Sequence, residues 1–152
     1  MDRNFRDMLS ALRAADADFL IVGAHALAVH GKPRATGDLD IWVRPTVQNA
    51  ARVYRALVEF GAPLHGITVA DFATPHTVYQ IGLPPSRIDI LTGIDGVTFD
   101  EAWPRRVQVS QPGLELPVLG RDDLIANKRA AGRPKDLVDV AELLAGDEGL
   151  GG

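Results

Sequence analysis

The chain has 152 residues, 46% of them hydrophobic, which predicts one domain with one core at residues 1–146 and a flexible tail at 147–152. The absence of cysteine excludes disulfides and thiolate metal sites, and the net charge of −4 argues against a protein that coats nucleic acid. No apolar run approaches the length of a membrane span or forms an N-terminal signal core, so we expect a cytoplasmic protein that contacts no membrane.

The first sixty residues are expected to alternate between helices and strands. Apolar side chains at helical spacing predict the first helix, and continuous apolar runs predict the buried strands. The expected elements are a helix at 3–15, a strand at 19–22, a short helix at 24–30, a strand at 39–43, and a helix that Thr46 caps and that ends at Phe60 before Gly61.

The second half is expected to hold four strands followed by two helices. The strands are placed at 78–83, 87–91, 107–109 and 114–119, and the helices at 121–131 and 134–145. Pro117 predicts that the last strand is an edge strand or starts late. The predicted core face of the last helix consists of Leu137, Val138, Val140, Ala141 and Leu144. This mixed order predicts an α/β or α+β fold, in which helices flank a mixed twisted sheet.

Two carboxylates stand at the start of the strand at 39–43. Residues two apart on a strand share a face, so Asp38 and Asp40 are expected to project together. With their Cβ atoms roughly 6–7 Å apart, the two charges would repel by about 2–3 kcal/mol at an effective dielectric near 20. A folded protein must offset that repulsion with a cation, an arginine or exposure to water.

These alternatives lead to different interpretations of the Asp-x-Asp pair. Bound Mg²⁺, as one ion or two, suits hard oxygen ligands and keeps substrate phosphates among its other ligands. A solvated strand edge explains the same two residues without a ligand. The sequence argues against a calcium loop, because Ile41, Trp42 and Val43 provide no side-chain oxygens where such a loop needs them.

Asp89 is a third candidate, since it is a carboxylate within the otherwise apolar strand Ile88–Leu91. If that strand lies beside Asp38 and Asp40, three acids converge, and such a group can hold two divalent cations about 3.5–4 Å apart. The alternative is that Asp89 forms an ion pair with Arg87 or another arginine.

The turn at Gly23 and Ala24 joins a buried strand directly to a helix. Backbone amides and the helix dipole at such a turn can bind a triphosphate, and glycine allows close approach of the backbone. Glycine at a strand-to-helix turn can equally serve packing alone.

Three further side chains are candidates for contacts with phosphate. Lys128 falls within the apolar stripe of its helix, where it either extends to solvent or points at an anion. Arg34 and Thr36 precede the aspartates and either contact the nucleotide or order their loop. Asp139 is expected on the solvent side of the last helix, alone or paired with a surface arginine.

Taken together, these residues resemble the nucleotidyltransferase superfamily typified by DNA polymerase β. The resemblance rests on Gly23-Ala24, on Arg34-x-Thr36-x-Asp38-Leu39-Asp40-Ile41, and on Asp89 in an apolar strand. The segments Asp123–Lys128 and Arg133–Asp139 are similar to small bacterial members, including the abortive-infection toxin type. The resemblance covers roughly residues 18 to 145.

The resemblance implies a Mg²⁺-dependent enzyme, or one that uses Mn²⁺, of the EC 2.7.7 type. Asp38, Asp40 and Asp89 would be the metal ligands and catalytic acids. Gly23, Ala24, Arg34, Thr36 and Lys128 would bind the nucleoside triphosphate. The reaction would transfer a nucleoside monophosphate to a hydroxyl of an acceptor (tRNA, protein or a small molecule) and release pyrophosphate.

One departure from the family pattern leaves other functions open. The family usually has Gly-Gly or Gly-Ser at the turn, whereas this chain has Ala24, which lacks a hydroxyl. A degenerate protein that binds nucleotide or a partner without catalysis is therefore an alternative. A toxin with an antitoxin partner is another.

Overall fold

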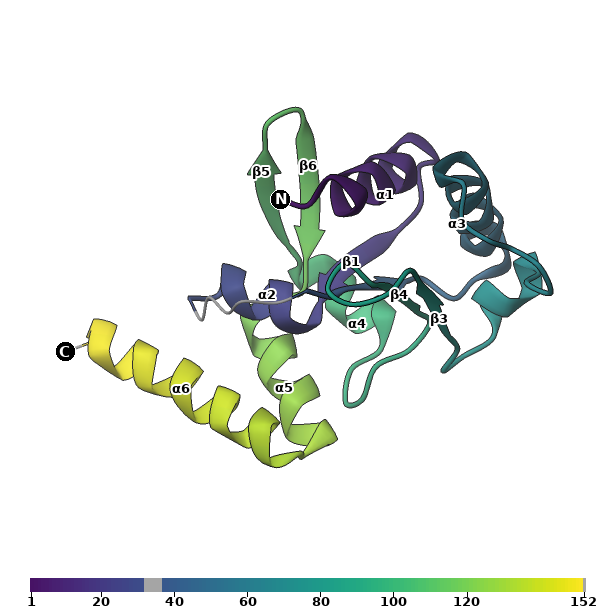
Figure 1. Cartoon of the computed structure of the whole chain (residues 1–152). Helices are drawn as coiled ribbons and strands as arrows, with labels where there is room; N and C mark the ends of the chain where they lie inside the picture. The colour runs from purple at the N-terminus through teal and green to yellow at the C-terminus, as the bar shows by residue number, and fades with distance from the viewer. Residues whose placement is uncertain (32–36, 152) are drawn as a thin grey trace.

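A mixed six-stranded sheet forms the centre of the computed structural model, which describes residues 1–31 and 37–151, with side chains described to Gly146 (Figure 1). The strand order is β3-β4-β2-β1-β6-β5. The strands are β1 Phe19–Val22, β2 Leu39–Val43, β3 Val78–Ile81, β4 Ile88–Leu91, β5 Val107–Gln111 and β6 Leu114–Val118. β2 pairs antiparallel with β1 and parallel with β4, so β2 and β4 begin at the same end of the sheet.

Helices pack on both sides of this sheet. They are α1 Arg3–Ala14, α2 Gly23–Val29, α3 Val47–Phe60, α4 Phe99–Ala102, α5 Arg121–Ala131 and α6 Pro134–Gly151, with 3₁₀ turns at Val69–Ala73 and Trp103–Arg105. α1 and α3 lie side by side on one side of the sheet, and α5 and α6 pack together on the other (Figure 1). Within residues 1–31 and 37–151, no helix has both the length and the apolar character that crossing a bilayer requires.

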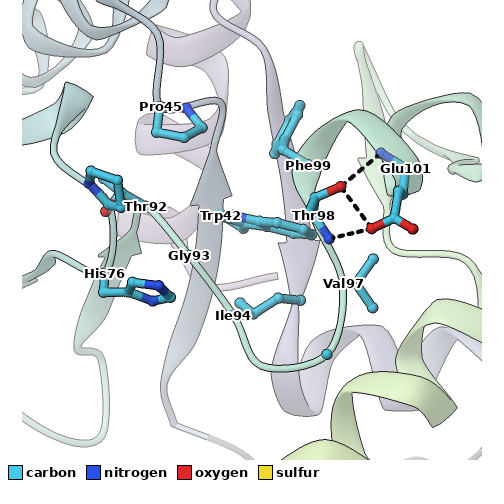
Figure 2. A pocket seen from close by; sticks show the side chains of 12 residues that line it. Trp42, Pro45, His76, Thr92, Gly93, Ile94, Val97, Thr98, Phe99 and Glu101 are labelled. Carbon is cyan, nitrogen blue, oxygen red and sulfur yellow. Dashed lines mark hydrogen bonds between the residues drawn. The ribbon is translucent and has the colours of Figure 1, made fainter.

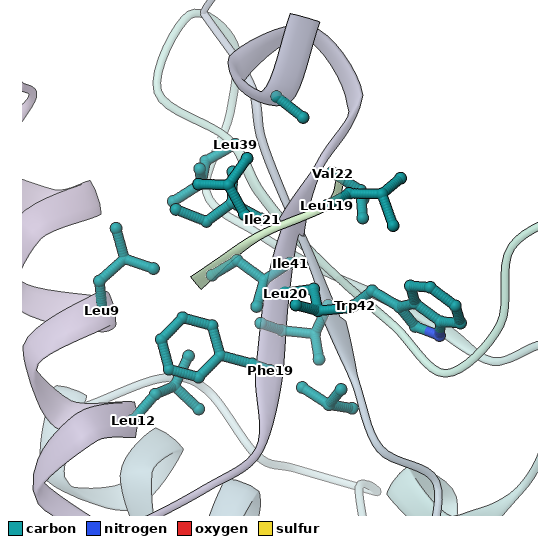
Figure 3. Packing of buried hydrophobic residues seen from close by; sticks show 14 of the residues in the cluster. Leu9, Leu12, Phe19, Leu20, Ile21, Val22, Leu39, Ile41, Trp42 and Leu119 are labelled. Atoms are coloured by element: carbon teal, nitrogen blue, oxygen red, sulfur yellow. The ribbon is translucent and has the colours of Figure 1, made fainter. Parts of the chain in front are cut away.

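The side chains of β1 and β2 alternate between the two faces of the sheet, as period-two geometry requires. Figure 3 shows one set directed toward Leu9 and Leu12 of α1 and another set on the opposite side. The set near α1 comprises Phe19, Ile21, Leu39 and Ile41. Val22 and Trp42 lie on the other face. Asp40 is two residues before Trp42, so its side chain shares that other face.

Several predicted boundaries are confirmed. Thr46 caps α3 by accepting a hydrogen bond from the Asn49 backbone N–H, and Gly61 ends the helix in the left-handed region at φ 88°. α5 has the predicted bounds. α6 is longer than expected and continues past Ala145 to Gly151, since glycine weakens a helix without ending it and no proline follows.

The prediction that Pro117 marks an edge strand is wrong, because β6 lies between β1 and β5. Pro117 pairs with Gln108 on β5, and the ladder to β1 starts only at Val118. The backbone N–H of Leu119 donates to the carbonyl of Ile21 on β1. Residues two apart on a strand direct their N–H groups to the same side, so an N–H at position 117 would also point toward β1. The pairing with β1 has not yet begun at that position, so the missing N–H of Pro117 breaks no bond of that ladder. The late start of the pairing with β1 therefore agrees with the sequence.

The predicted core face of α6 is also wrong in part. Leu137, Val138 and Leu144 are 50%, 55% and 37% exposed, and Ala141 is exposed as well. The buried residues are Asp136, Asp139, Val140 and Leu143. α6 is thus rotated so that two carboxylates face the interior beside Val140 and Leu143, while the rest of the predicted apolar stripe is exposed.

Candidate functional site

Asp38, Asp40 and Asp89 lie together at the start of β2 and β4. Asp40 is the register partner of Asp89 in the parallel β2–β4 pair, so both side chains are on the same face. Asp38 immediately precedes β2. All three line one cavity of about 360 Å³. The convergence of the three acids, which the sequence predicted only if these strands were neighbours, is confirmed.

The cavity has an acidic side formed by the sheet and a second side formed by the C-terminal helices. On the sheet side it is also lined by Gly23, Ala24, Leu27 and Arg87. From α5, α6 and the link between them it is lined by Lys128, Arg133, Lys135, Asp136 and Asp139. The helix side of the cavity therefore carries three cations and two carboxylates.

Arg87 forms ion pairs with two of the three acids, Asp38 and Asp89. Its Nε donates to Asp89 Oδ1 at 3.0 Å and its Nη2 to Asp89 Oδ2 at 3.3 Å. The same Nη2 lies 3.0 Å from Asp38 Oδ2. The alternative interpretation, in which Asp89 pairs with Arg87, therefore holds together with the convergence of the acids.

Asp40 is the member of the cluster whose ionised form is disfavoured by its surroundings. Its pKa is raised to about 6, first by burial and then by the carboxylates of Asp89 and Asp38, while Arg87 acts in the opposite direction. A carboxyl with this pKa changes between its neutral and its ionised form about one pH unit below neutrality.

Gly23 is required by the position of Asp40. Its φ is +67°, and a Cβ built on it would lie 2.3 Å from Asp40 Oδ2. A Cβ there would force the carboxylate of Asp40 to shift, so glycine lets the first turn of α2 approach it closely. The sequence identified Gly23 and Ala24 as a turn near phosphate, and both line the cavity.

The substitution Gly23→Ala is expected to destabilise the protein by about 2–5 kcal/mol, because the left-handed φ costs about 1–2 kcal/mol and the overlap with Asp40 about 1–3 kcal/mol more. Urea unfolding measures the change. Gly61→Ala is the matched control, since Gly61 has φ +88° and nothing within 4 Å of the added Cβ. It should therefore lose only the about 1–2 kcal/mol that the left-handed φ costs. Equal losses in the two variants would contradict the role of the Asp40 contact.

A second close approach fixes the segment that carries Asp38. A Cβ on Gly37 would lie 2.3 Å from the backbone oxygen of Pro85, so this segment and the turn between β3 and β4 touch backbone to backbone. The backbone N–H of Leu39 also donates to the carbonyl of Arg87. Asp38 is therefore placed by the neighbouring strand connection as well as by its own strand.

Lys128 lies inside the protein and is held by two acids of α6. Its Nζ is 3.0 Å from Asp139 Oδ2 and 3.6 Å from Asp136 Oδ1, and both carboxylates are 1% exposed. Arg133 also pairs with Asp136 and holds its pKa below the usual range. The expectation that Asp139 is solvated is wrong, because the ammonium of Lys128 compensates its charge within the interior.

The buried pair predicts a large cost for removing one partner. Lys128→Met is expected to lower the free energy of unfolding by about 3–5 kcal/mol, since it removes the ammonium that lies 3.0 Å from the buried carboxylate of Asp139. Lys135→Met is the control, because Lys135 lines the same cavity from an exposed position. The double variant Lys128→Met/Asp139→Leu should recover much of the loss, and no recovery would contradict the pairing.

Two predicted residues, Arg34 and Thr36, lie outside the described residues. The sequence did not identify Arg133, Lys135 and Asp136 as part of the site. The two cations flank the predicted helix start at Pro134, but nothing local indicates that this start faces the aspartates.

The donor set fits a hard divalent cation, with one condition. The oxygens of Asp38, Asp40 and Asp89 are of the kind that Mg²⁺ prefers, and burial, followed by the neighbouring carboxylates, raises the pKa of Asp40. With the described side chains as they stand, no three acids or histidines are placed to hold one metal ion. Arg87 bonds to Asp38 and Asp89, so it would have to move for those oxygens to reach a metal.

Comparison with known proteins bears on the fold of the chain. No family model matches the chain, and no curated protein matches it. The crystal structure of "a putative nucleotidyltransferase (TM1012)" from Thermotoga maritima is similar, with a TM-score of 0.62 over 94% of this chain and 91% of that one. The two chains share a fold. Their sequences are 16% identical, so this likeness concerns the fold alone, and it confirms the predicted mixed sheet with flanking helices.

Proposed function

We propose that this protein is a metal-dependent nucleotidyltransferase, which transfers a nucleoside monophosphate from a nucleoside triphosphate to a hydroxyl and releases pyrophosphate. One observation carries the proposal: three carboxylates at the start of two paired strands line one cavity together with Lys128, Arg133 and Lys135, beside a glycine turn. This arrangement provides acidic ligands for a cation on the sheet side, and on the helix side three cations and two carboxylates, which leave one net positive charge for phosphates.

In this proposal Asp38, Asp40 and Asp89 would hold Mg²⁺, or Mn²⁺ in its place. The bound cation would neutralise charge on the phosphates and polarise the phosphorus under attack. Asp89, whose register partner is Asp40, would also bind the acceptor hydroxyl or help to remove its proton. Arg87 would leave these oxygens when the cation binds.

The positive groups of the opposite wall would receive the triphosphate. Lys128 would approach the phosphates while Asp136 and Asp139 hold its ammonium in place. Arg133 and Lys135 line the same wall, and Lys135 is exposed and free to extend. Gly23 and Ala24 would present the first turn of α2 to the nucleotide from the sheet side.

The test is transfer of label from α-³²P nucleoside triphosphates in the presence of Mg²⁺. The acceptors are tRNA, aminoglycosides and a cell extract, each tested with the four nucleotides. Asp40→Ala and Asp89→Asn should reduce labelling by about 10²-fold or more, because each removes a charge needed in the transition state. Asp122→Asn, whose carboxylate is 90% exposed, is the matched control. Labelling by Asp40→Ala at the wild-type level would overturn the proposal.

A second candidate function is nucleotide binding without transfer. It is favoured by the bonds of Arg87 to Asp38 and Asp89 and by Ala24, which brings no hydroxyl to the cavity. Calorimetry with ATP and GTP distinguishes the two functions. Saturable binding with no labelled product from any acceptor would support this candidate over the enzyme.

A further inference from the structure

β5 is an edge strand of the sheet. Within the described residues it pairs with β6 alone, and Figure 1 shows it on the outer side of the β5–β6 hairpin. The ladder with β6 runs unbroken from Val107 to Gln111, so no bulge interrupts it. Alternate residues of β5 therefore direct their backbone N–H and C=O groups away from the sheet, where another strand can pair with them.

β5 lacks the features that usually protect an edge strand. Such strands carry lysine, proline, inward-pointing charges or bulges, which prevent pairing with another chain. No charged residue stands between Arg106 and Glu115, and β5 itself contains no proline. Val107 is 38% exposed, and Gln108 and Ser110 are exposed as well. The edge is thus open to a further strand.

The two faces of β5 specify the kind of strand that fits beside it. Val107 and Val109 lie on the face that their cross-strand partners on β6 bury. The alternate residues, on the other face, are polar and uncharged. A strand added at this edge should therefore carry apolar side chains on the first face and uncharged polar ones on the second. β5 itself has this pattern, so a second copy of the chain provides a matching strand.

An antiparallel pair of β5 strands about a twofold axis satisfies the backbone. The outward N–H groups belong to every second residue, so the two residue numbers of each opposed pair must have an even sum. With Val109 opposite its own copy, all five residues are paired, Val107 with Gln111 and Gln108 with Ser110. Valine then packs on valine, and no two like charges are opposed.

The polar face of this pair can also form hydrogen bonds. The Ser110 hydroxyl donates to the Glu115 carboxylate of its own chain at 2.6 Å. Its oxygen keeps a lone pair, which can accept from the Gln108 amide of the other copy. The twofold axis produces this bond twice.

The ends of β5 are anchored before any partner arrives. Thr98 and Glu101 exchange hydrogen bonds at the start of α4, as Figure 2 shows. Arg106, the last residue before β5, lies over the Trp103 ring at 3.9 Å from its centroid. At the far end Arg6 of α1 donates to the backbone of the β5–β6 turn. The strand therefore needs little ordering when it pairs.

The other edge strand, β3, is less suited to self-pairing. It has four residues, so a register with an even sum opposes only three of them. The Tyr79 hydroxyl of β3 also donates to the carbonyl of Pro63, which places the preceding chain against this strand. β5 therefore offers the longer self-complementary edge.

We propose that two copies of this protein associate through β5, in antiparallel register about Val109, so that their two six-stranded sheets become one continuous sheet. β1 and β6 separate this edge from β2, which carries Asp40, so the proposal goes beyond the transfer reaction and does not depend on it. A pair of five-residue strands is a small interface, and we expect a weak dimer with a Kd on the order of 10–100 µM.

Sedimentation equilibrium of the full chain tests the association. The mass should rise from that of one chain at about 1 µM to nearly that of two chains at about 500 µM. A wild-type protein that stays monomeric over this whole range would overturn the proposal. This measurement needs no variant, so it stands whatever the variants do.

Two double variants test the register. Both contain Ser110→Lys, combined either with Gln108→Glu or with Gln108→Lys. Position 108 of one copy faces position 110 of the other, so the first combination opposes unlike charges twice and the second opposes like charges twice. The first should dimerise at least about tenfold more tightly than the second. Equal affinities of the two would contradict the register.

Val78→Lys is the matched control at the other edge of the sheet, where Val78 is 56% exposed on β3. It should leave the dimer affinity unchanged, and loss of the dimer in this variant would assign the contact to β3 and overturn the proposal. Urea unfolding at about 1 µM, where the chain is monomeric, checks that each variant retains the fold.

Discussion

Asp40→Asn is expected to stabilise the metal-free protein by about 3 kcal/mol at pH 8 and by only about 1 kcal/mol at pH 4.5. The folded-state pKa of Asp40 is about 6, against 3.8 for the ordinary carboxyl. Ionised Asp40 therefore disfavours the fold. This penalty grows as the pH rises from 3.8 to about 6, is complete above pH 6, and is absent below 3.8. Asparagine does not ionise, so it removes the penalty.

Urea unfolding in EDTA at the two pH values measures this difference between the variant and the wild type. Asp122→Asn is the control, because its exposed carboxylate should give little change at either pH. The same Asp40→Asn protein should have lost the proposed transfer. A gain of equal size at pH 4.5 and pH 8 would show that burial and neighbouring charge do not raise the pKa of Asp40.

Arg87→Gln is expected to destabilise the metal-free protein by about 2–3 kcal/mol and to tighten Mn²⁺ binding at least about tenfold. In the wild type the guanidinium bonds to Asp38 and Asp89 and offsets part of their repulsion. Without it three carboxylates face one another, which weakens the fold. A divalent cation then no longer has to displace an arginine, so more of its binding energy is realised.

Urea unfolding in EDTA gives the first effect, and calorimetric titration with Mn²⁺ gives the second. Arg129→Gln, which removes an exposed arginine of α5, is the matched control for charge. Unchanged or weaker Mn²⁺ binding by Arg87→Gln would mean that Arg87 does not compete with a cation for these oxygens. Such a result would leave the arginine as a fixed part of the acidic cluster.

The sequence predicted the strands that carry the acids, because apolar runs and period-two spacing are local signals. It could not show that Asp40 and Asp89 are register partners, since that depends on β2 pairing with β4, about fifty residues later, in parallel. Arg87 entered only as an alternative partner of Asp89. That it also bonds to Asp38 depends on the same strand pairing.

The last helix shows why apolar spacing was misleading there. Counting apolar residues placed Leu137, Val138 and Leu144 inside, yet all three are exposed. Asp136 and Asp139 are inside because Lys128, on the preceding helix, and Arg133, which precedes α6, compensate their charges. An ion pair between two elements leaves no trace in the periodicity of either element, so its burial could not be predicted from the sequence.

The backbone contact between Gly37 and Pro85 couples the acidic cluster to a hairpin connection that carries none of its acids. Lengthening that connection by one residue would push against the chain just ahead of Asp38 and so shift one carboxylate relative to its two neighbours. The length of the connection between β3 and β4 is therefore constrained by the spacing of the three acids.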